Sequence, residues 1–389
     1  MGEWRDLPIK QLGRVITGAT PKSSEPDSWG DEIDFITPTD QREGFREARA
    51  ARRLSSVGAE RLSSRIVPAG STCFTCIGAT IGKTSLTTRP AVTNQQINSV
   101  IPNPASTDCE FLYYLLTYHA ADIARIASGS ATPIVNKSQF ENFVVRVPSV
   151  ATQKAIGRIL GALDDKIAVN ERIARSCDEL RALRFVDFIQ SSPSKVIERP
   201  LSSFADFVNG RAFTKNATGT GRMVIRIAEI NSGPGGSTVY NDIDVPDRHL
   251  ARPGDVLFAW SGSLTVARWF RPEAIVNQHI FKVIPRDGLP NWLLFELIRT
   301  KLKKFQSIAA DKATTMGHIQ RRHLDEPVSA PADDVVSRLD SQLGPLWERA
   351  LTAEQESLTL AALRDTLLPK LMSGELRVRD AEKAVEEAL

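Results

Sequence analysis

The chain has 389 residues, of which 42% are hydrophobic and 24% are charged, and its formal net charge is +3. This length allows two to three ordinary domains, and this composition excludes an intrinsically disordered protein. The sequence contains no apolar run of membrane-spanning length and no apolar stretch of a signal peptide at its start, so we expect a cytoplasmic protein.

An internal repeat organises the sequence. The stretch LGRVITG at Leu12–Gly18 returns as FADFVNG at Phe204–Gly210, and AGSTCF at Ala69–Phe74 returns as PGDVLF at Pro253–Phe258. The offset between the copies falls from 192 to 184 residues, as small deletions in loops would produce.

The strongest match joins VTNQQINSVIP at Val92–Pro102 to IVNQHIFKVIP at Ile275–Pro285, and a leucine-rich and aromatic helix is expected soon after each copy. Two copies of this size predict two globular domains rather than a solenoid. We therefore expect a mixed α/β (α+β) fold, with modules at residues 1–149 and 196–331 and long helical regions at 150–195 and 332–389.

Apolar residues at spacings of four and three predict a long helix after each module. Asn170 interrupts the first stripe, Thr152 is the expected cap, and the first helix should end at Ser191–Ser194. The predicted seam residues are Ile156, Leu160, Leu163, Ile167, Leu339, Leu343, Leu346 and Leu360. Two such helices can pack on each other antiparallel, which we favour, or each can pack on its own module.

The second helical region contains two signals that limit its helix. Gly344-Pro345 predicts a break or kink, and Pro369 or Ser373-Gly374 predicts the helix end. The tail at residues 375–389 is compatible with a short strand (ELRVR) followed by a helix, or with a frayed end.

Motifs for catalysis and metal binding are incomplete. GATIGKT at Gly78–Thr84 has one residue too few for a phosphate loop. Asp164-Asp165-Lys166 lies in the middle of a predicted helix, where a solvated charged face is expected instead of a nuclease site. Cys73 and Cys76 lack a second ligand pair and are expected to be buried strand residues. We expect no catalysis by this chain alone and no bound metal.

Charge is unevenly distributed. Residues 196–331 carry 18 Lys and Arg against 13 Asp and Glu, whereas residues 332–389 carry 7 against 12. A basic second module suits contact with phosphates.

The whole chain, over residues 5–378, resembles the specificity subunit of Type I restriction–modification enzymes. The layout of module, helix, module, helix carries this resemblance. So do LGRVITGATPK (Leu12–Lys22), VTNQQINSVIP, IGRILGALDDKIAVNERI (Ile156–Ile173) and LRDTLLPKLMSGELRV (Leu363–Val378). Gln153, near the start of the first helix, has no counterpart in the second, so we expect pseudo-twofold symmetry in outline only.

The resemblance implies that each module is a target recognition domain reading one half of a split, asymmetric DNA sequence. It also implies that the helices form an antiparallel pair that sets the gap and docks two methyltransferase subunits, which a restriction and translocase subunit joins. S-adenosylmethionine for adenine methylation, and ATP with magnesium, would be bound by these partners, and no cofactor by this chain.

Bases are read by polar and basic side chains in loops that differ between the copies. The candidates are Thr20, Lys22, Ser23, Thr80, Lys83, Ser128, Ser130 and Thr132 in the first module, and Arg211, Lys215, Arg226, Asn231, Ser261, Ser263, Arg268, Lys312, Thr314 and Thr315 in the second. Asn94, Gln95, Asn277 and Gln278 occur in both copies and are expected to hold loops by hydrogen bonds. An alternative is a protein–protein scaffold with duplicated modules; a third reading is an enzyme with an unrecognised site.

Overall fold

A computed structural model describes residues 4–42, 44–128, 132–311 and 317–387. The chain divides into two compact units, the first made of residues 1–168 and 359–389 and the second of residues 169–358. Each unit therefore combines one module with parts of both long helices, α6 (Val150–Ser191) and α9 (Asp333–Ser373).

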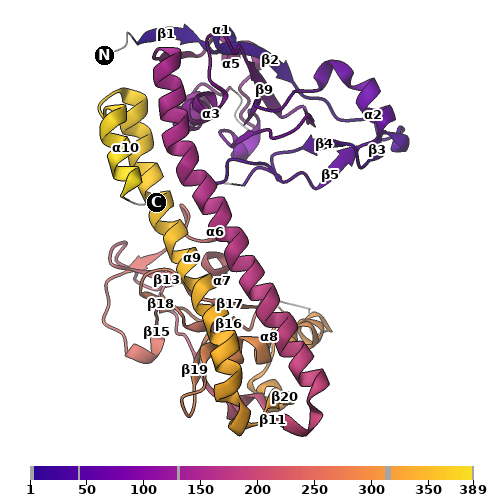
Figure 1. Ribbon diagram of the computed structural model, residues 1–389, viewed down its shortest axis with the longest axis vertical. Coiled ribbons are helices and arrows are strands. Elements are labelled where there is room, and N and C mark those ends of the chain that lie inside the picture. Colours follow the sequence, from indigo (N-terminus) through magenta and orange to yellow (C-terminus); the bar gives the residue numbers. More distant parts are fainter. Residues whose placement is uncertain (1–3, 43, 129–131, 312–316, 388–389) are drawn as a thin grey trace. The chain divides into compact units, whose positions relative to one another are not determined.

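Two four-stranded sheets form the centre of unit 1, drawn in indigo and violet in Figure 1. The first has the order β2 (Gly13–Thr17), β9 (Ile97–Pro102), β6 (Thr72–Thr75), β7 (Thr84–Leu86), with every neighbouring pair antiparallel. The second has the order β3 (Trp29–Gly30), β5 (Arg52–Leu54), β4 (Ile33–Ile36), β8 (Ala91–Thr93). The pair β1 (Arg5–Pro8) and β10 (Val144–Val147) closes the module beside α6.

Short helices complete unit 1. They are α1 (Ile9–Leu12), α2 (Ser56–Arg61), α3 (Cys109–Tyr118), α4 (Ala120–Arg125), α5 (Lys137–Asn142) and the C-terminal α10 (Val378–Glu386). Asp108 accepts a hydrogen bond from the Phe111 amide and so caps α3. Six consecutive residues of α3, from Phe111 to Leu116, are buried, and this helix lies at the centre of the core.

Unit 2 also contains two four-stranded sheets. Their orders are β12 (Ala205–Asn209), β19 (Ile280–Pro285), β16 (Val256–Ala259), β17 (Thr265–Arg268), and β14 (Tyr240–Asn241), β13 (Arg222–Ile225), β18 (Ala274–Val276), β15 (Leu250–Ala251). The pair β11 (Val196–Pro200) and β20 (Pro327–Pro331) corresponds to β1 and β10, and the helices of this module are α7 (Ile227–Ser232) and α8 (Asn291–Asp311).

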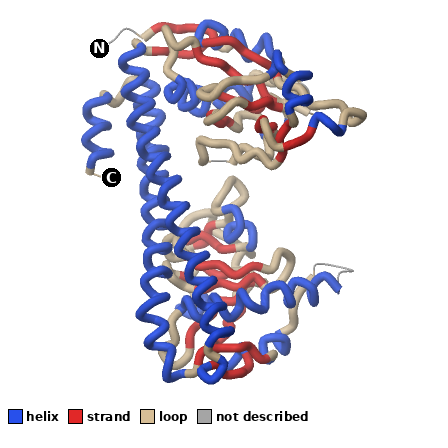
Figure 2. Tube along the Cα trace, turned by 45° about the vertical axis from the view of Figure 1, so that its right-hand side comes forward, coloured by secondary structure: helices blue, strands red, loops and turns tan. Residues whose placement is uncertain are grey.

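The strand registers confirm the predicted duplication. Gly13 pairs with Pro102 in the first antiparallel sheet, and Ala205 pairs with Pro285 in the second. The parallel pair of β4 and β8 returns as the parallel pair of β13 and β18. Figure 2 shows, within each module, the same combination of strands in red and helices in blue.

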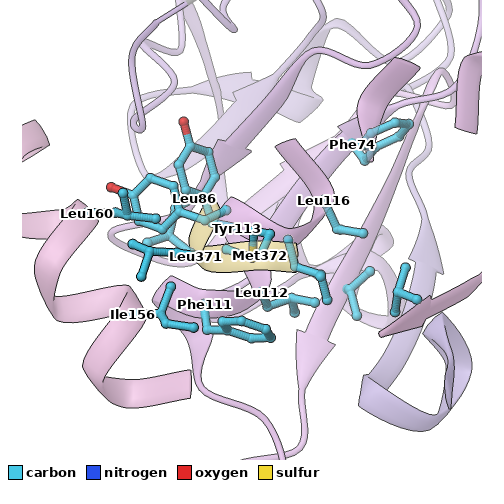
Figure 3. Close-up of a cluster of buried hydrophobic side chains, with 14 of the residues drawn as sticks. Phe74, Leu86, Phe111, Leu112, Tyr113, Leu116, Ile156, Leu160, Leu371 and Met372 are labelled. Carbon is cyan, nitrogen blue, oxygen red and sulfur yellow. The ribbon is translucent and has the colours of Figure 1, made fainter. Parts of the chain in front are cut away.

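The two long helices pack against each other within each unit. In unit 1, Ile156 and Leu160 of α6 share a hydrophobic core with Leu371 and Met372 of α9 and with Phe111 of α3 (Figure 3). In unit 2, Ala174 of α6 packs on Ala350 and Ala353 of α9. The early part of α6 meets the late part of α9 in unit 1, and the reverse holds in unit 2, so the helices run antiparallel. Both predicted packing modes occur together, because each helix part also contacts its module.

The structure corrects two expectations about helix ends. Ser149, not Thr152, lies at the start of α6, where its hydroxyl accepts from the Thr152 amide at 3.4 Å. The last residues form helix α10 without a strand at ELRVR, because Val378, Ala381 and Val385 pack against the core of unit 1. The ends predicted at Ser191 and at Ser373-Gly374 are confirmed.

The break expected at Gly344-Pro345 is absent, since α9 continues through it. Leu343 and Trp347, on either side, are buried in the core of unit 2, and their packing offsets the hydrogen bond that proline removes. Asp164 also differs from expectation, because it is buried instead of lying on a solvated face. In the described part of the chain, no helix is both long and apolar enough to cross a membrane.

Candidate nucleic-acid interface

Three loops of unit 1 meet at one end of its antiparallel sheet. Strands β2 and β6 end there, at Thr17 and Thr75, and strands β9 and β7 begin there, at Ile97 and Thr84. The loops 18–25, 76–83 and 94–96 are therefore neighbours. We call this the loop end of unit 1.

A fourth segment joins this loop end through backbone hydrogen bonds. The Gly78 amide donates to the Pro133 carbonyl at 2.9 Å, and Ile77 forms a bridge with Ile134. The Thr20 hydroxyl donates to Oε1 of Gln95 at 2.6 Å, which links the first loop to the third. The loops are thus held as one surface.

Unit 2 has an equivalent loop end, formed by loops 210–216, 260–264 and 277–279. Its fourth segment is held in the same way, since the Gly262 amide donates to the Gly317 carbonyl at 2.9 Å and Ser261 bridges to His318. Gly78 and Gly262 have φ values of 79° and 66°, so they are turn residues.

A glycine at the same repeat position opens each loop end. A Cβ added to Gly18 would lie 2.1 Å from the Thr93 carbonyl oxygen, and one added to Gly210 would lie 2.1 Å from the Asn277 carbonyl oxygen. No side chain fits there, which explains why LGRVITG and FADFVNG both end in glycine. The close approach seats the first loop on the turn before β9 or β19.

Asn94 and Asn277 hold these turns, as expected from their presence in both copies. Oδ1 of Asn94 accepts from the Gln96 amide at 3.1 Å, and Oδ1 of Asn277 accepts from the Phe213 amide at 3.1 Å. Gln95 holds Thr20, whereas Gln278 is exposed and is bound to Arg211 through its backbone amide. These residues therefore hold the loop end in each unit, whereas the exposed side chains around them differ between the units.

The loop end of unit 1 carries most of the candidates from the first module. Exposed on it are Thr20, Lys22, Ser23, Ser128 and Thr132, whereas Thr80 and Lys83 are half-buried. Ser130 lies outside the described residues. Thr80 and Lys83 line a cavity of about 470 Å³ beside Arg42, Phe45 and Ala120, and Nζ of Lys83 donates to the Pro38 carbonyl at 3.2 Å.

The loop end of unit 2 carries four candidates. Arg211, Lys215 and Ser263 are exposed there, whereas Ser261 is 4% exposed and serves the bridge to His318. Asn231 is exposed on α7, which follows β13. Lys312, Thr314 and Thr315 lie outside the described residues.

Arg268 is not the loop residue that the sequence analysis expected. It occupies the far end of β17 from the loops and is 6% exposed. Its guanidinium donates to both carboxylate oxygens of Asp178 on α6, at 3.1 and 3.2 Å, and to Glu354 on α9 at 2.8 Å. Burial raises the pKa of Glu354 even though Arg268 opposes that shift. Arg268 therefore joins its module to the helices, and its guanidinium donors are used within the protein.

Arg226 is likewise committed within the protein. Its guanidinium donates to both carboxylate oxygens of Glu229, at 3.1 and 2.6 Å, and to the Ser237 carbonyl at 2.7 Å. Arg226 thereby closes the first turn of α7 instead of offering free donors to a base.

The comparisons with known proteins all point to the same family. Residues 1–176 match the family described as Type I restriction modification DNA specificity domain. The Type I restriction enzyme MjaIX specificity subunit of Methanocaldococcus jannaschii is 25% identical over 418 residues, which cover 97% of this chain and 94% of that protein. The HindI specificity subunit of Haemophilus influenzae is 38% identical over 151 residues, or 38% of this chain and 32% of that protein.

A solved structure shares the fold. The crystal structure of the S subunit of a Type I restriction–modification system from M. genitalium aligns with a TM-score of 0.61 at 14% identity, over 95% of this chain and 96% of that one. Over its whole length the chain is thus similar to a Type I specificity subunit, and its first 176 residues match the DNA specificity domain of that family. The resemblance and the mixed α/β architecture expected from the sequence are confirmed.

The loop end of unit 2 contains aromatic residues that the sequence analysis did not single out. Trp260 is half-exposed, its ring lies 5.2 Å from that of His279, and its indole N–H donates to Oδ1 of Asn209 at 2.8 Å. His279 has a φ of 72°, a strained value for a residue other than glycine. The aligned stretches VTNQQIN and IVNQHIF differ at this position, where Gln96 stands opposite His279. This difference was the sequence signal that could have pointed to the histidine.

The cysteines of the CxxC motif and the seams of the long helices lie in the interior. Cys73 and Cys76 are buried, as expected, and burial raises the pKa of their thiols to about 11 and about 12. The described ranges contain no cluster of three or more His, Cys, Asp or Glu side chains that could hold a metal ion. All eight predicted seam residues are buried except Leu346, which is half-buried against the core of unit 2.

Proposed function

We propose that this specificity subunit binds a bipartite, asymmetric duplex DNA target, with each loop end reading one half-site. One observation carries the proposal: the two loop ends have the same backbone framework but different exposed side chains. Thr20, Lys22 and Ser23 in unit 1 stand where unit 2 has Arg211 and Lys215.

The chemistry of these side chains suits duplex DNA. Lysine and arginine bind phosphates, arginine also pairs with guanine in the major groove, and hydroxyls bind base edges or phosphates. Two frameworks that agree in backbone and differ in side chains can present two different sequences at equivalent positions. As a specificity subunit, the chain supplies recognition instead of catalysis.

The binding test compares duplexes that differ in one half-site. Methylated adenines mapped in a host carrying the full system define the target, and the purified complex is then titrated with the native duplex and with duplexes scrambled in either half. We expect each scrambled half to weaken binding, and affinity for the native duplex to fall at least about tenfold between 50 and 200 mM salt. Equal affinity for native and doubly scrambled duplexes would contradict the proposal.

We further propose that α6 docks methyltransferase subunits in this complex, which would then bind S-adenosylmethionine, while restriction subunits would use ATP with magnesium. Support comes from an apolar stripe on the part of α6 in unit 2. Val169, Leu180, Leu183 and Val186 are 37%, 40%, 69% and 38% exposed, and Leu180 and Leu183 lie one turn apart on one face. A stripe this exposed is typical of a surface that another helix covers.

Leu183→Glu tests the docking. It places a charge where an apolar contact is proposed, so we expect loss of co-purification with the modification subunit while the chain stays folded. Val57→Glu is the matched control, because Val57 is 40% exposed on the module of unit 1. If Leu183→Glu and Val57→Glu retain the partner equally, the stripe is not the docking surface.

A further inference from the structure

A buried arginine recurs at one repeat position of the long helices. Arg181 in α6 and Arg364 in α9 are both the thirty-second residue of their helix. Arg181 is 0% exposed and Arg364 is 8% exposed. A buried guanidinium needs a carboxylate or equivalent partner, so each position constrains what packs around it.

In unit 1 the acid comes from the other long helix. Nη1 of Arg364 donates to Oδ1 of Asp164 on α6 at 2.6 Å. The hydroxyl of Tyr114, on helix α3 of the module, donates to Oδ2 of the same aspartate at 2.5 Å. In unit 1, therefore, helix α3 of the module contributes the phenol and the long helix α6 contributes the carboxylate.

In unit 2 the acid comes from the module. Nε of Arg181 donates to Oε1 of Glu296 on α8 at 3.0 Å, and the side chain of Glu296 is 0% exposed. The guanidinium also lies over the ring of Trp347 on α9, 4.9 Å from its centroid. Asp178, on α6 itself, accepts a further hydrogen bond from Nη1 at 2.6 Å.

The acid and the aromatic ring have exchanged places between the units. Tyr114 and Glu296 are each the sixth residue of their module helix. Asp164 and Trp347 are each the fifteenth residue of their long helix. The residue types at the module-helix position and at the long-helix position have therefore changed together between the units. The arginine beside them is present in both units.

We propose that these two clusters form matched locks, which allow each module to seat only beside its own parts of the long helices. Seating the α8 module beside Asp164 would place two buried carboxylates next to one arginine. Seating the α3 module beside Trp347 would leave Arg181 with Asp178 of its own helix as its single acid, in place of Asp178 and Glu296. Buried charges that lose a partner or gain a like-charged neighbour are strongly unfavourable.

The locks consequently fix how each module seats within its own unit. The seating itself does not depend on DNA binding, so it can be tested without DNA.

The test transplants the unit 1 pair into unit 2 of the full chain. Glu296→Tyr removes the fully buried acid beside Arg181 and leaves only Asp178, whereas Trp347→Asp adds a further acid to these two. By breaking or overcharging a buried pair, each variant should lower the melting temperature by roughly 10 °C. The double variant restores one acid and one ring, and we expect it to recover at least half of the summed loss. Losses that simply add, or a double variant that does not fold, would overturn the proposal.

A second measurement uses unit 1. Tyr114→Glu adds a buried carboxylate beside Asp164, whereas Tyr114→Phe removes only one hydrogen bond, so the glutamate variant should melt well below the phenylalanine variant. Equal melting temperatures would contradict the lock. Asp206→Tyr is the surface control for Glu296→Tyr, because Asp206 pairs with Arg286 at an exposed site of the same module and should tolerate the change.

Discussion

The loop ends and the helix-facing sides of the two modules differ in what the repeat has preserved. At the loop ends the backbone is preserved, down to Gly18 and Gly210, and the exposed side chains vary. At the helix-facing sides one arginine is preserved, and its acid and aromatic partners have changed places. The exposed side chains of the loop ends thus differ one by one between the units, whereas the buried acid and ring differ as a pair.

The largest expected effect concerns the buried charges on the helix-facing sides of the modules. Arg268→Gln leaves Asp178 and Glu354 without the guanidinium that binds both, and the side chain it replaces is 3% exposed. We expect the free energy of unfolding to fall by about 3–5 kcal/mol, measured by urea denaturation. Arg286→Gln breaks an exposed pair and should cost less than about 1 kcal/mol. Equal losses would mean that burial does not distinguish the two sites.

The next effect tests the shared framework. Gly18→Ala or Gly210→Ala places a Cβ 2.1 Å from a carbonyl oxygen, so the first loop must move away from the turn. We expect a loss of roughly 1–3 kcal/mol in unfolding free energy for either variant, as for overpacking of a core. Gly235→Ala is the control, since a Cβ there meets nothing within 4 Å. A neutral Gly18→Ala would show that the loop is not seated by this contact.

Sequence reasoning found the framework because repeats and periodicity report backbone requirements. The two modules, the long helices and the roles of Asn94 and Asn277 followed from pattern alone. Burial of charge did not follow, because an arginine in a strand looks the same whether it faces solvent or a helix. Arg268 and Asp164 were therefore misplaced: their partners, Asp178 and Arg364, are 90 and 200 residues away in sequence.

Each exposed side chain of a loop end should affect the affinity for one DNA half-site only. Lys22→Gln should weaken binding to the half-site read by unit 1, and Arg211→Gln to the half-site read by unit 2. Each should cost about 1–2 kcal/mol, or roughly 5- to 30-fold in affinity, as for one lost phosphate or base contact. Titrations with duplexes scrambled in either half measure this. If each variant weakens both halves alike, the loop ends do not read separately.

The smallest effect links the loop end of unit 2 to stability. His249 is 4% exposed, with its ring 5.7 Å from that of Phe213. Burial lowers the pKa of His249, and the nearby cations of Arg211 and Arg248 lower it further. In the unfolded chain a histidine pKa is about 6.5, so the unfolded state binds more protons below that pH. The stability that comes from keeping His249 neutral is therefore complete above about pH 6.5 and is lost as the pH falls below it.

One titrating proton changes the unfolding free energy by at most about 1.4 kcal/mol per pH unit. Urea denaturation between pH 5 and 8 should show that His249→Phe removes part of the acid-side decline. Arg211→Gln should remove a smaller part, because it takes away one of the two cations and leaves burial in place. His119→Phe in unit 1, where burial also lowers the histidine pKa, is the comparison: its decline should not respond to Arg211→Gln. An Arg211→Gln variant with an unchanged pH profile would indicate that the charge of Arg211 is directed away from His249, toward solvent or DNA.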